Sequence, residues 1–286
     1  MRWFITLFST ALCAHLAMSA AGSKLAVVTG ANKGIGFQIA QKLCSGGFKV
    51  ILACRNEALG QKAAEELRAF GQAEFRCVDI SNEESIKSFA ASMETDYPVV
   101  DVLINNAAIA FPSANPTPFR EQAAPTMRPN YFGTLLMTEQ MLPLLRRSSS
   151  PRLVNVASMS GHLRILKSPQ LKEKFTSPDL TIPQLSDLVR KFVSDVEAGV
   201  HSDRGWPNSN YGMSKLAVVA MTKVFAAQEP QMKINCVCPG WCDTDMSSHS
   251  GPRSAEVGAR TPAWLATIPD DGPTGKFFTD EKELEW

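Results

Sequence analysis

The sequence lacks the features that would assign it to several classes of protein. Its 286 residues contain no internal repeat and no low-complexity tract, and 29 basic residues nearly balance 28 acidic ones. A net charge of +1 gives no electrostatic basis for binding nucleic acid or an acidic membrane surface. The proportions of hydrophobic (44%) and charged (20%) residues are those of an ordinary globular protein with one large or two small domains.

A disulfide framework is also missing. The seven cysteines include no Cys-x-x-Cys pair, and the chain contains no Asn-x-Ser/Thr glycosylation sequon. Four of the cysteines lie in apolar, strand-like runs, where a thiol behaves as a small hydrophobe: Cys54, Cys77, Cys236 and Cys238. This pattern favours a reducing compartment and predicts a cytoplasmic protein. We expect no metal site.

The first 22 residues favour a different location. Arg2 precedes an apolar run over residues 3–18 and then small residues, which is the shape of a secretory signal peptide. As a membrane span the run is marginal in length, and His15 interrupts it. Alternatively the segment is never translated, because Met18 would begin a compact chain. The secretory pathway or the ER membrane, reached through residues 1–22, is therefore the alternative location, and residues 23–286 form the folded domain.

Strand-like and helix-like segments alternate along that domain. Short apolar runs predict strands at 24–29, 48–54, 75–78, 99–104, 153–156 and 233–237, and helical patterns fall at 34–43, 57–70, 83–93, 132–145 and 211–227. Strands that are apolar on both faces indicate an α/β fold, a single doubly wound parallel sheet (Rossmann) with its ligand at the carboxyl edge. Residues 169–207 interrupt the alternation and predict a mainly helical insert near the mouth of the site.

A glycine-rich turn follows the first predicted strand, in Thr-Gly-Ala-Asn-Lys-Gly-Ile-Gly at 29–36. Glycines at these positions permit a tight turn, close approach to a pyrophosphate and close helix–strand packing, and the helix N-terminus favours the anion. An ordinary glycine-rich turn is the alternative. The predicted cofactor contacts here are Gly30, Asn32, Lys33, Gly34, Ile35 and Gly36.

The end of the second predicted strand bears on the choice of cofactor. An acid there would bind the ribose 2′-hydroxyl of NAD, whereas a cation accommodates the 2′-phosphate of NADP. This strand ends in Ala-Cys-Arg-Asn, with Arg55 at the tip, and Lys33 adds a second cation from the neighbouring turn. The pair favours NADPH; two solvated surface cations are the alternative.

Polar residues also follow three later strands. Asp79 is placed to accept a hydrogen bond from adenine while Ile80 packs on its ring, although a cap for the helix at 83 explains Asp79 equally well. Asn106 is placed to connect neighbouring loops or to touch the cofactor ribose. Ser158, after the fifth strand, points to the catalytic crevice or is simply a turn residue.

Tyr211 and Lys215 lie four residues apart, which places them on one face of a helix. An ammonium beside a phenol favours the phenolate and lowers its pKa, so that a tyrosine becomes able to exchange a proton near neutral pH. Alone, the Tyr-x-x-x-Lys pattern is weak, and chance or surface decoration is its ordinary explanation. The glycine turn and the strand-end serine strengthen it.

Taken in order, these motifs and Pro239-Gly240 resemble those of a classical short-chain dehydrogenase/reductase, from about Lys24 onward. Within that family the chain is most similar to the monomeric NADPH-dependent carbonyl reductases. That likeness comes from Gly-Ala-Asn-Lys-Gly-Ile-Gly, Asn-Tyr-Phe-Gly-Thr at 130–134, the insert before Gly-Trp-Pro at 205–207, and Cys-Pro-Gly-Trp at 238–241.

The resemblance implies four catalytic roles. Tyr211 is the general acid, and Lys215 holds the nicotinamide ribose and lowers the tyrosine pKa. Ser158 hydrogen-bonds the substrate carbonyl, and Asn130 positions a water that links Lys215 to solvent. Further implied contacts are Pro239, Gly240, Cys242 and Thr244 at the nicotinamide, and Met159 and Trp241 in the substrate pocket.

The implied function is NADPH-dependent reduction of ketones, aldehydes or quinones by a monomer, with membrane contact only if the leader is retained. Two alternatives remain: a catalytically silent NADP-binding scaffold or sensor, and an NADP-linked steroid or lipid alcohol dehydrogenase. The chain departs from the family pattern at Ala108, where glycine is usual, and in a short connection at 228–232.

Overall fold

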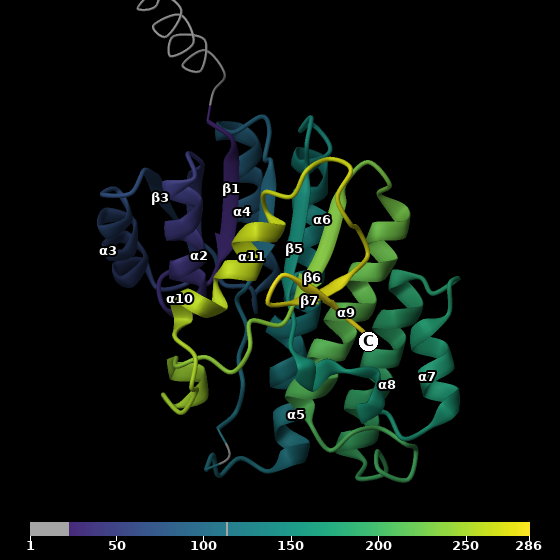
Figure 1. Ribbon diagram of the computed structural model, residues 1–286. Coiled ribbons are helices and arrows are strands. Elements are labelled where there is room, and N and C mark those ends of the chain that lie inside the picture. The colour runs from purple at the N-terminus through teal and green to yellow at the C-terminus, as the bar shows by residue number, and fades with distance from the viewer. Residues whose placement is uncertain (1–22, 113) are drawn as a thin grey trace, which may run out of the picture.

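A computed structural model describes residues 23–112 and 114–286, which form an α/β fold around one sheet (Figure 1). Its strands stand in the order β3-β2-β1-β4-β5-β6-β7-β8. All neighbours pair in parallel except β7 and β8. The strands are β1 (Leu25–Thr29), β2 (Lys49–Cys54), β3 (Gln72–Cys77), β4 (Val102–Asn105), β5 (Arg152–Val156), β6 (Lys233–Val237), β7 (Phe277–Thr279) and β8 (Lys282–Leu284).

Helices cover both faces of the sheet. They are α2 (Gly34–Ser45), α3 (Glu57–Leu67), α4 (Glu83–Asp96), α5 (Phe119–Met127), α6 (Thr134–Leu145), α7 (Pro169–Thr176), α8 (Ile182–Glu197), α9 (Asn210–Gln228), α10 (Ala255–Gly258) and α11 (Arg260–Leu265). A π-helical segment, η1 (Arg128–Gly133), joins α5 to α6, and short 3-10 turns follow β5 and β6 as η2 (Met159–Gly161), η3 (Leu163–Ile165) and η4 (Asp245–Ser247).

Successive residues of the central strands pack into two separate hydrophobic cores, one on each face of the sheet. In β1, Val27 packs in the core under α4, α6, α8 and α9, whereas Val28 packs in the core under α2, α3 and α11. Leu103 and Ile104 of β4 divide in the same way. Both faces of these strands are therefore apolar, as the sequence predicts for a parallel sheet between helix layers.

The strand order reverses between β1 and β4. From β1 the chain moves outward to β2 and β3, then returns to β4 on the other side and continues to β5 and β6. The loops after β1 and β4 diverge at this point and leave a crevice at the carboxyl edge, where doubly wound sheets bind ligands. That edge faces downward in Figure 1, toward α5.

Several elements differ from the sequence prediction. β3 begins at Gln72 rather than at 75, and as an edge strand it is only partly buried. The helical region expected at 132–145 is α6, preceded by η1 and by α5, which was not predicted. The hairpin of β7 and β8 was also missed, because three-residue strands give too little periodicity to recognise.

The insert predicted at 169–207 contains α7 and α8, which lie beyond α9 at the right of Figure 1. Buried Asp195 organises it: its carboxylate accepts a hydrogen bond from Trp206 Nε1 at 2.9 Å and from Lys191 Nζ at 2.7 Å, and pairs with Arg204. Burial opposes ionisation, but these donors outweigh it and lower the pKa of Asp195. α8 itself packs against α5 and α9.

The signal-like leader predicted at 1–22 lies outside the described residues. Within residues 23–112 and 114–286, no helix combines the length and the apolarity needed to cross a membrane.

Candidate active site

A cleft of about 1140 Å³ runs along the carboxyl edge of the sheet. It collects wall residues from the turn after β1 and from the ends of β2, β4, β5 and β6. The predicted site residues that line it are Gly30, Asn32, Lys33, Gly34, Ile35, Gly36, Arg55, Asp79, Ile80, Asn106, Tyr211, Lys215, Pro239 and Thr244.

Six other predicted residues do not line this cleft. Asn130 and Cys242 are buried behind it, and the Cys242 thiol donates to the Pro239 carbonyl at 3.4 Å. Met159 and Trp241 are instead 49% and 63% exposed, so neither closes a pocket in this structure. The remaining two are Ser158 and Gly240.

The glycine turn shapes the anion-binding end of the cleft. Gly30 and Gly34 have φ of +65° and +57°, a conformation that favours glycine. A Cβ on Gly36 would lie 2.3 Å from the Gly30 carbonyl oxygen, so only glycine lets α2 approach the turn this closely. The first turn of α2 contains no acidic residue, and its N-cap residue, Lys33, makes no side-chain capping hydrogen bond. Its free amide groups therefore suit a pyrophosphate.

Asn106 connects the loops on the two sides of the crevice. Its Nδ2 donates to the carbonyls of Thr29 and Gly30, at 2.9 and 3.3 Å, and Thr29 Oγ1 accepts from the Asn106 amide at 2.9 Å. Of the two predicted roles the structure shows the loop-connecting one. Ala108 in the same loop has no positive φ, so its methyl group causes no backbone strain.

Arg55 and Lys33 both line the cleft, but their surroundings differ. Arg55 is exposed, and no ion pair or hydrogen bond of its side chain is found within the described chain. The Lys33 ammonium pairs with the carboxylate of Asp245, from the loop after β6. Of the two cations expected at a 2′-phosphate, Lys33 is therefore already paired, whereas Arg55 has no side-chain partner among residues 23–112 and 114–286.

Asp79 is not the helix cap that the sequence allowed. Asn82 caps α4 by accepting from the Ser85 amide at 3.0 Å. The Asp79 carboxylate instead accepts from the amide and hydroxyl of Ser81 at 2.8 and 2.7 Å. Partial burial opposes ionisation, but these bonds and the charges of Arg55 and Arg128 outweigh it and lower the pKa of Asp79. An ionised acceptor therefore lies at the end of the cleft where adenine was expected.

Tyr211 and Lys215 lie in the first turns of α9, with Lys215 Nζ 5.6 Å from the centroid of the Tyr211 ring. Burial raises the pKa of Tyr211 to about 12, with Cys238 adding to the rise and a hydrogen bond with Ser158 opposing it. Burial lowers the pKa of Lys215 to about 8, and Cys238 opposes that shift. The lowered phenol pKa expected from the sequence is therefore not found in this structure, because burial dominates.

Ser158 is held beside this pair by the turn that it begins. Its Oγ caps η2 by accepting from the Ser160 amide at 3.1 Å. Gly161, at the end of η2, lies so close to α9 that a Cβ would be 2.5 Å from the Lys215 carbonyl carbon. The close contact fixes the strand-end serine relative to the helix that carries Tyr211 and Lys215.

Asn130 occupies the π-helical segment η1, an irregularity that is frequent at functional sites. Its amide is fully engaged: Oδ1 accepts from the Ile109 amide at 2.8 Å, and Nδ2 donates to the Ile109 carbonyl and to Ser214 Oγ at 2.9 and 3.0 Å. The side chain thus joins η1 to α9 one residue before Lys215. Its proposed link to a water stays a prediction.

The sequence did not reveal every residue of the cleft wall. Asp243, Asp245, Met246 and His249 come from the loop after β6, which has no periodicity to guide its placement. A second group lies close only through the packing of α8 on α5: Arg128, Phe132, Arg190, Val193, Ser194 and Glu197. In the part of the chain described, no cluster of three or more His, Cys, Asp or Glu side chains is arranged to hold a metal ion.

A glycine turn at a helix N-terminus, with a tyrosine, a lysine and a serine at the same sheet edge, defines a dinucleotide-dependent oxidoreductase of the doubly wound α/β class. The family model for short chain dehydrogenase matches residues 24–169, and that for Enoyl-(Acyl carrier protein) reductase matches residues 197–270. The chain belongs to the short-chain dehydrogenase/reductase family.

Individual relatives agree with this assignment. Over 276 residues the chain is 42% identical to carbonyl reductase (NADPH) 1 of Sus scrofa, covering 92% of this chain and 94% of that protein. It is 41% identical to carbonyl reductase (NADPH) 3 of Rattus norvegicus, covering 92% and 99%. Among solved structures, salutaridine reductase from Papaver somniferum superposes with a TM-score of 0.82 at 32% identity, covering 90% and 99%.

Proposed function

We propose that this protein reduces the carbonyl group of ketones, aldehydes or quinones at the expense of NADPH. The observation that carries the proposal is the placement of Tyr211, Lys215 and Ser158 on the same sheet edge as an uncapped α2 N-terminus. The match to carbonyl reductases over 92% of the chain supports the substrate class. A screen of carbonyl compounds with NADPH tests it, and a parent protein that oxidises NADPH with none of them would favour a binding module instead.

The residues of the site divide the work of binding and proton transfer. The α2 N-terminus and the glycine turn would hold the pyrophosphate, and Arg55 the 2′-phosphate. NADPH supplies the hydride when bound. Tyr211 then gives its phenolic proton to the alkoxide oxygen, while the Ser158 hydroxyl stabilises charge on that oxygen. A phenol with a pKa near 12 keeps its proton at neutral pH, so it is ready to act as the acid.

Lys215 is expected to set the upper pH limit of the reaction. Burial lowers the pKa of Lys215 to about 8, so its ammonium loses its proton as the pH rises through that value, well below the pKa of about 12 of Tyr211. The neutral amine no longer stabilises the phenolate that forms when Tyr211 gives up its proton, so kcat of the parent protein should fall above about pH 8. Lys215→Ala should lower kcat at neutral pH and should no longer show this fall. Lys223→Ala, an exposed lysine of the same helix, is the control, and a fall near pH 8 that persists in Lys215→Ala would contradict the role of the ammonium.

We infer that the protein is a monomer in solution. Many family members pair through the helices that follow the fourth and fifth strands, and here α8 packs on α5 and α9. That packing occupies apolar area that a second subunit would otherwise cover. Light scattering after gel filtration should give the mass of one chain across a tenfold range of concentration. The mass of two chains would show that the insert leaves the pairing surface available.

We also infer a cytoplasmic location, from the missing glycosylation sequon and the unpaired cysteine pattern. Imaging the full chain with a fluorescent tag at its C-terminal end should give a diffuse cytoplasmic signal. A reticular signal would assign the protein to the ER instead.

A further inference from the structure

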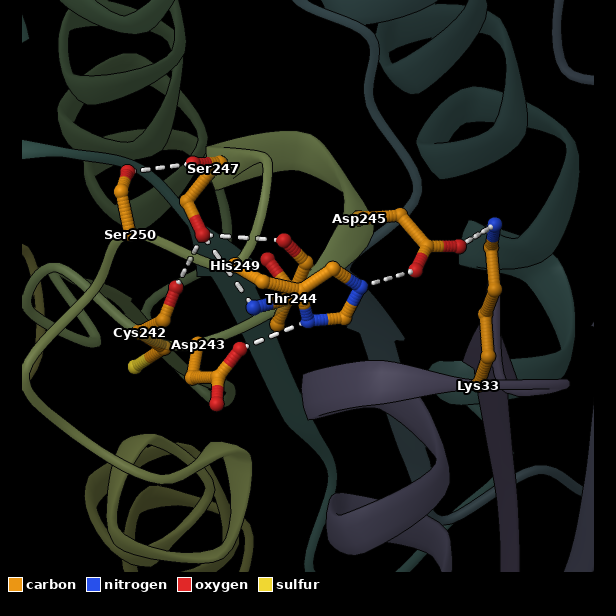
Figure 2. Close-up of polar contacts among 8 residues, drawn as sticks. All are labelled: Lys33, Cys242, Asp243, Thr244, Asp245, Ser247, His249 and Ser250. Carbon is orange, nitrogen blue, oxygen red and sulfur yellow. Dashed lines mark hydrogen bonds and ion pairs between the residues drawn. The ribbon is translucent and has the colours of Figure 1, made fainter.

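The loop after β6 crosses the cofactor cleft at residues 243–249, here called the strap. Figure 2 shows the Asp245 carboxylate reaching Lys33 in the glycine turn, a partner 212 positions away. Both side chains remain more than half exposed. Next to Asp245, the Thr244 methyl group lies 3.4 Å from where a Cβ on Gly34 would stand. The strap is thus held directly over the turn that would receive the pyrophosphate.

The strap is fastened internally as well. His249 lies between two carboxylates, with Nδ1 2.7 Å from Asp243 and Nε2 3.0 Å from Asp245 (Figure 2). The Ser247 hydroxyl donates to the Cys242 carbonyl at 2.7 Å and accepts from the Thr244 amide at 3.2 Å. Ser248 and His249 both have positive φ, at +49° and +57°, so these contacts hold a backbone that is unfavourable by itself. Asp245 is therefore presented to Lys33 in a fixed position.

Asp245 and a 2′-phosphate require the same ammonium. We propose that Asp245 determines part of the cofactor specificity. Its carboxylate pairs with Lys33 until a 2′-phosphate takes its place at the ammonium. The inference rests on the proposed use of NADPH. A ligand shifts such an equilibrium only through its differential interaction with the two states. NADPH must break the Lys33–Asp245 pair to gain the ammonium, whereas NADH has no phosphate with which to compete, so Asp245 weakens NADPH binding selectively.

Asp243 offers a matched control for the general effect of negative charge. It lines the same cleft, belongs to the same strap and bonds the same His249, yet it makes no contact with Lys33. Replacing either aspartate removes one negative charge near a polyanionic ligand, which favours both cofactors, and NADPH slightly more because its 2′-phosphate adds charge. Asp245→Asn should change the ratio of NADPH to NADH affinity more than Asp243→Asn does, because only Asp245 holds Lys33.

The experiment is a titration of the full chain with NADPH and with NADH, followed by cofactor fluorescence at pH 8 and low ionic strength. The variants are Asp245→Asn, Asp243→Asn, Lys33→Met and the double variant Lys33→Met/Asp245→Asn. Exposed ion pairs contribute little, so Asp245→Asn should lower the Kd of NADPH about threefold to fivefold and that of NADH less than twofold. In the Lys33→Met background, Asp245→Asn should change the affinity ratio no more than Asp243→Asn does.

Two results would overturn the proposal. One is an equal change for both cofactors in Asp245→Asn, matching that in Asp243→Asn. The other is a selective gain larger than that of Asp243→Asn that persists in the Lys33→Met background, because such a gain would not depend on the ammonium. If the variants show the expected changes in Kd but the wild-type chain reduces no carbonyl compound, the proposed reaction is wrong and the role of Asp245 is still supported. No binding of NADPH at all would reject both.

Discussion

Replacing Tyr211 with phenylalanine should reduce kcat for carbonyl reduction by about 10²- to 10⁴-fold, the usual contribution of a positioned general acid. The substitution removes only the hydroxyl, so the ring still packs at the start of α9. Lys215 keeps its hydrogen bond to the Val156 carbonyl at 2.8 Å, and the α2 N-terminus is untouched. The affinity for NADPH should therefore stay within about twofold of the parent value. Stopped-flow reduction and a cofactor titration measure the two quantities separately.

The chain contains a suitable control in its other tyrosines. Tyr97 packs away from the cleft, and its hydroxyl bonds Glu74 at 2.5 Å at the edge of the sheet. Tyr97→Phe also loses one hydrogen-bonded hydroxyl and should retain kcat. If Tyr211→Phe kept more than a tenth of the parent kcat while Tyr97→Phe behaved normally, another group would have to supply the proton.

Reversing the charge of Arg55 should change the cofactor preference. A charge-assisted hydrogen bond contributes about 1.5–3 kcal/mol, so its loss in Arg55→Asp corresponds to about a 10- to 100-fold weaker binding of NADPH, and repulsion between carboxylate and phosphate adds to it. NADH carries no 2′-phosphate, and an acid at the end of β2 accepts a hydrogen bond from its ribose hydroxyl. Its affinity should therefore hold or improve. The ratio of kcat/KM for the two cofactors measures the change.

A charge-matched control separates this contact from the net charge of the protein. Arg68 lies at the end of α3, outside the cleft, and pairs with Glu65. Arg68→Asp makes the same charge change and should weaken NADPH binding less than twofold. Equal losses for NADPH and NADH in Arg55→Asp would show that Arg55 does not face the 2′-phosphate.

Much of the site could be predicted because parallel strands bring their carboxyl ends to one edge. Gly30, Arg55, Asn106 and Tyr211 are far apart in the sequence, yet each follows or faces the end of a recognisable strand, and all four line one cleft. The glycine positions carried their own physical signature, since a side chain on Gly36 has no room beside the Gly30 carbonyl. Such local signals can be recognised in the sequence without knowledge of the fold.

Other features had no local signal. Whether Asp79 or Asn82 capped α4 depended on the position of the Ser81 turn, which brings its donors to Asp79. The pKa of Tyr211 depended on burial, which outweighed the nearby ammonium. The partner of Lys33 could not be deduced either, because the loop that carries Asp245 has no regular structure beyond one short turn.

The sequence by itself determined the class of fold and the chemical groups at its crevice, because continuous apolar runs, helical periodicity and strand-end motifs are properties of short segments. The tertiary structure alone decided which charges meet. Within the part of the chain that the structure describes, Lys33 pairs with Asp245, the Arg55 side chain has no partner, and α8 contributes to the cleft wall. The physical reason is that these pairings depend on how loops and helices distant in the chain are packed, and Coulomb energies fall off with separation in space rather than in sequence.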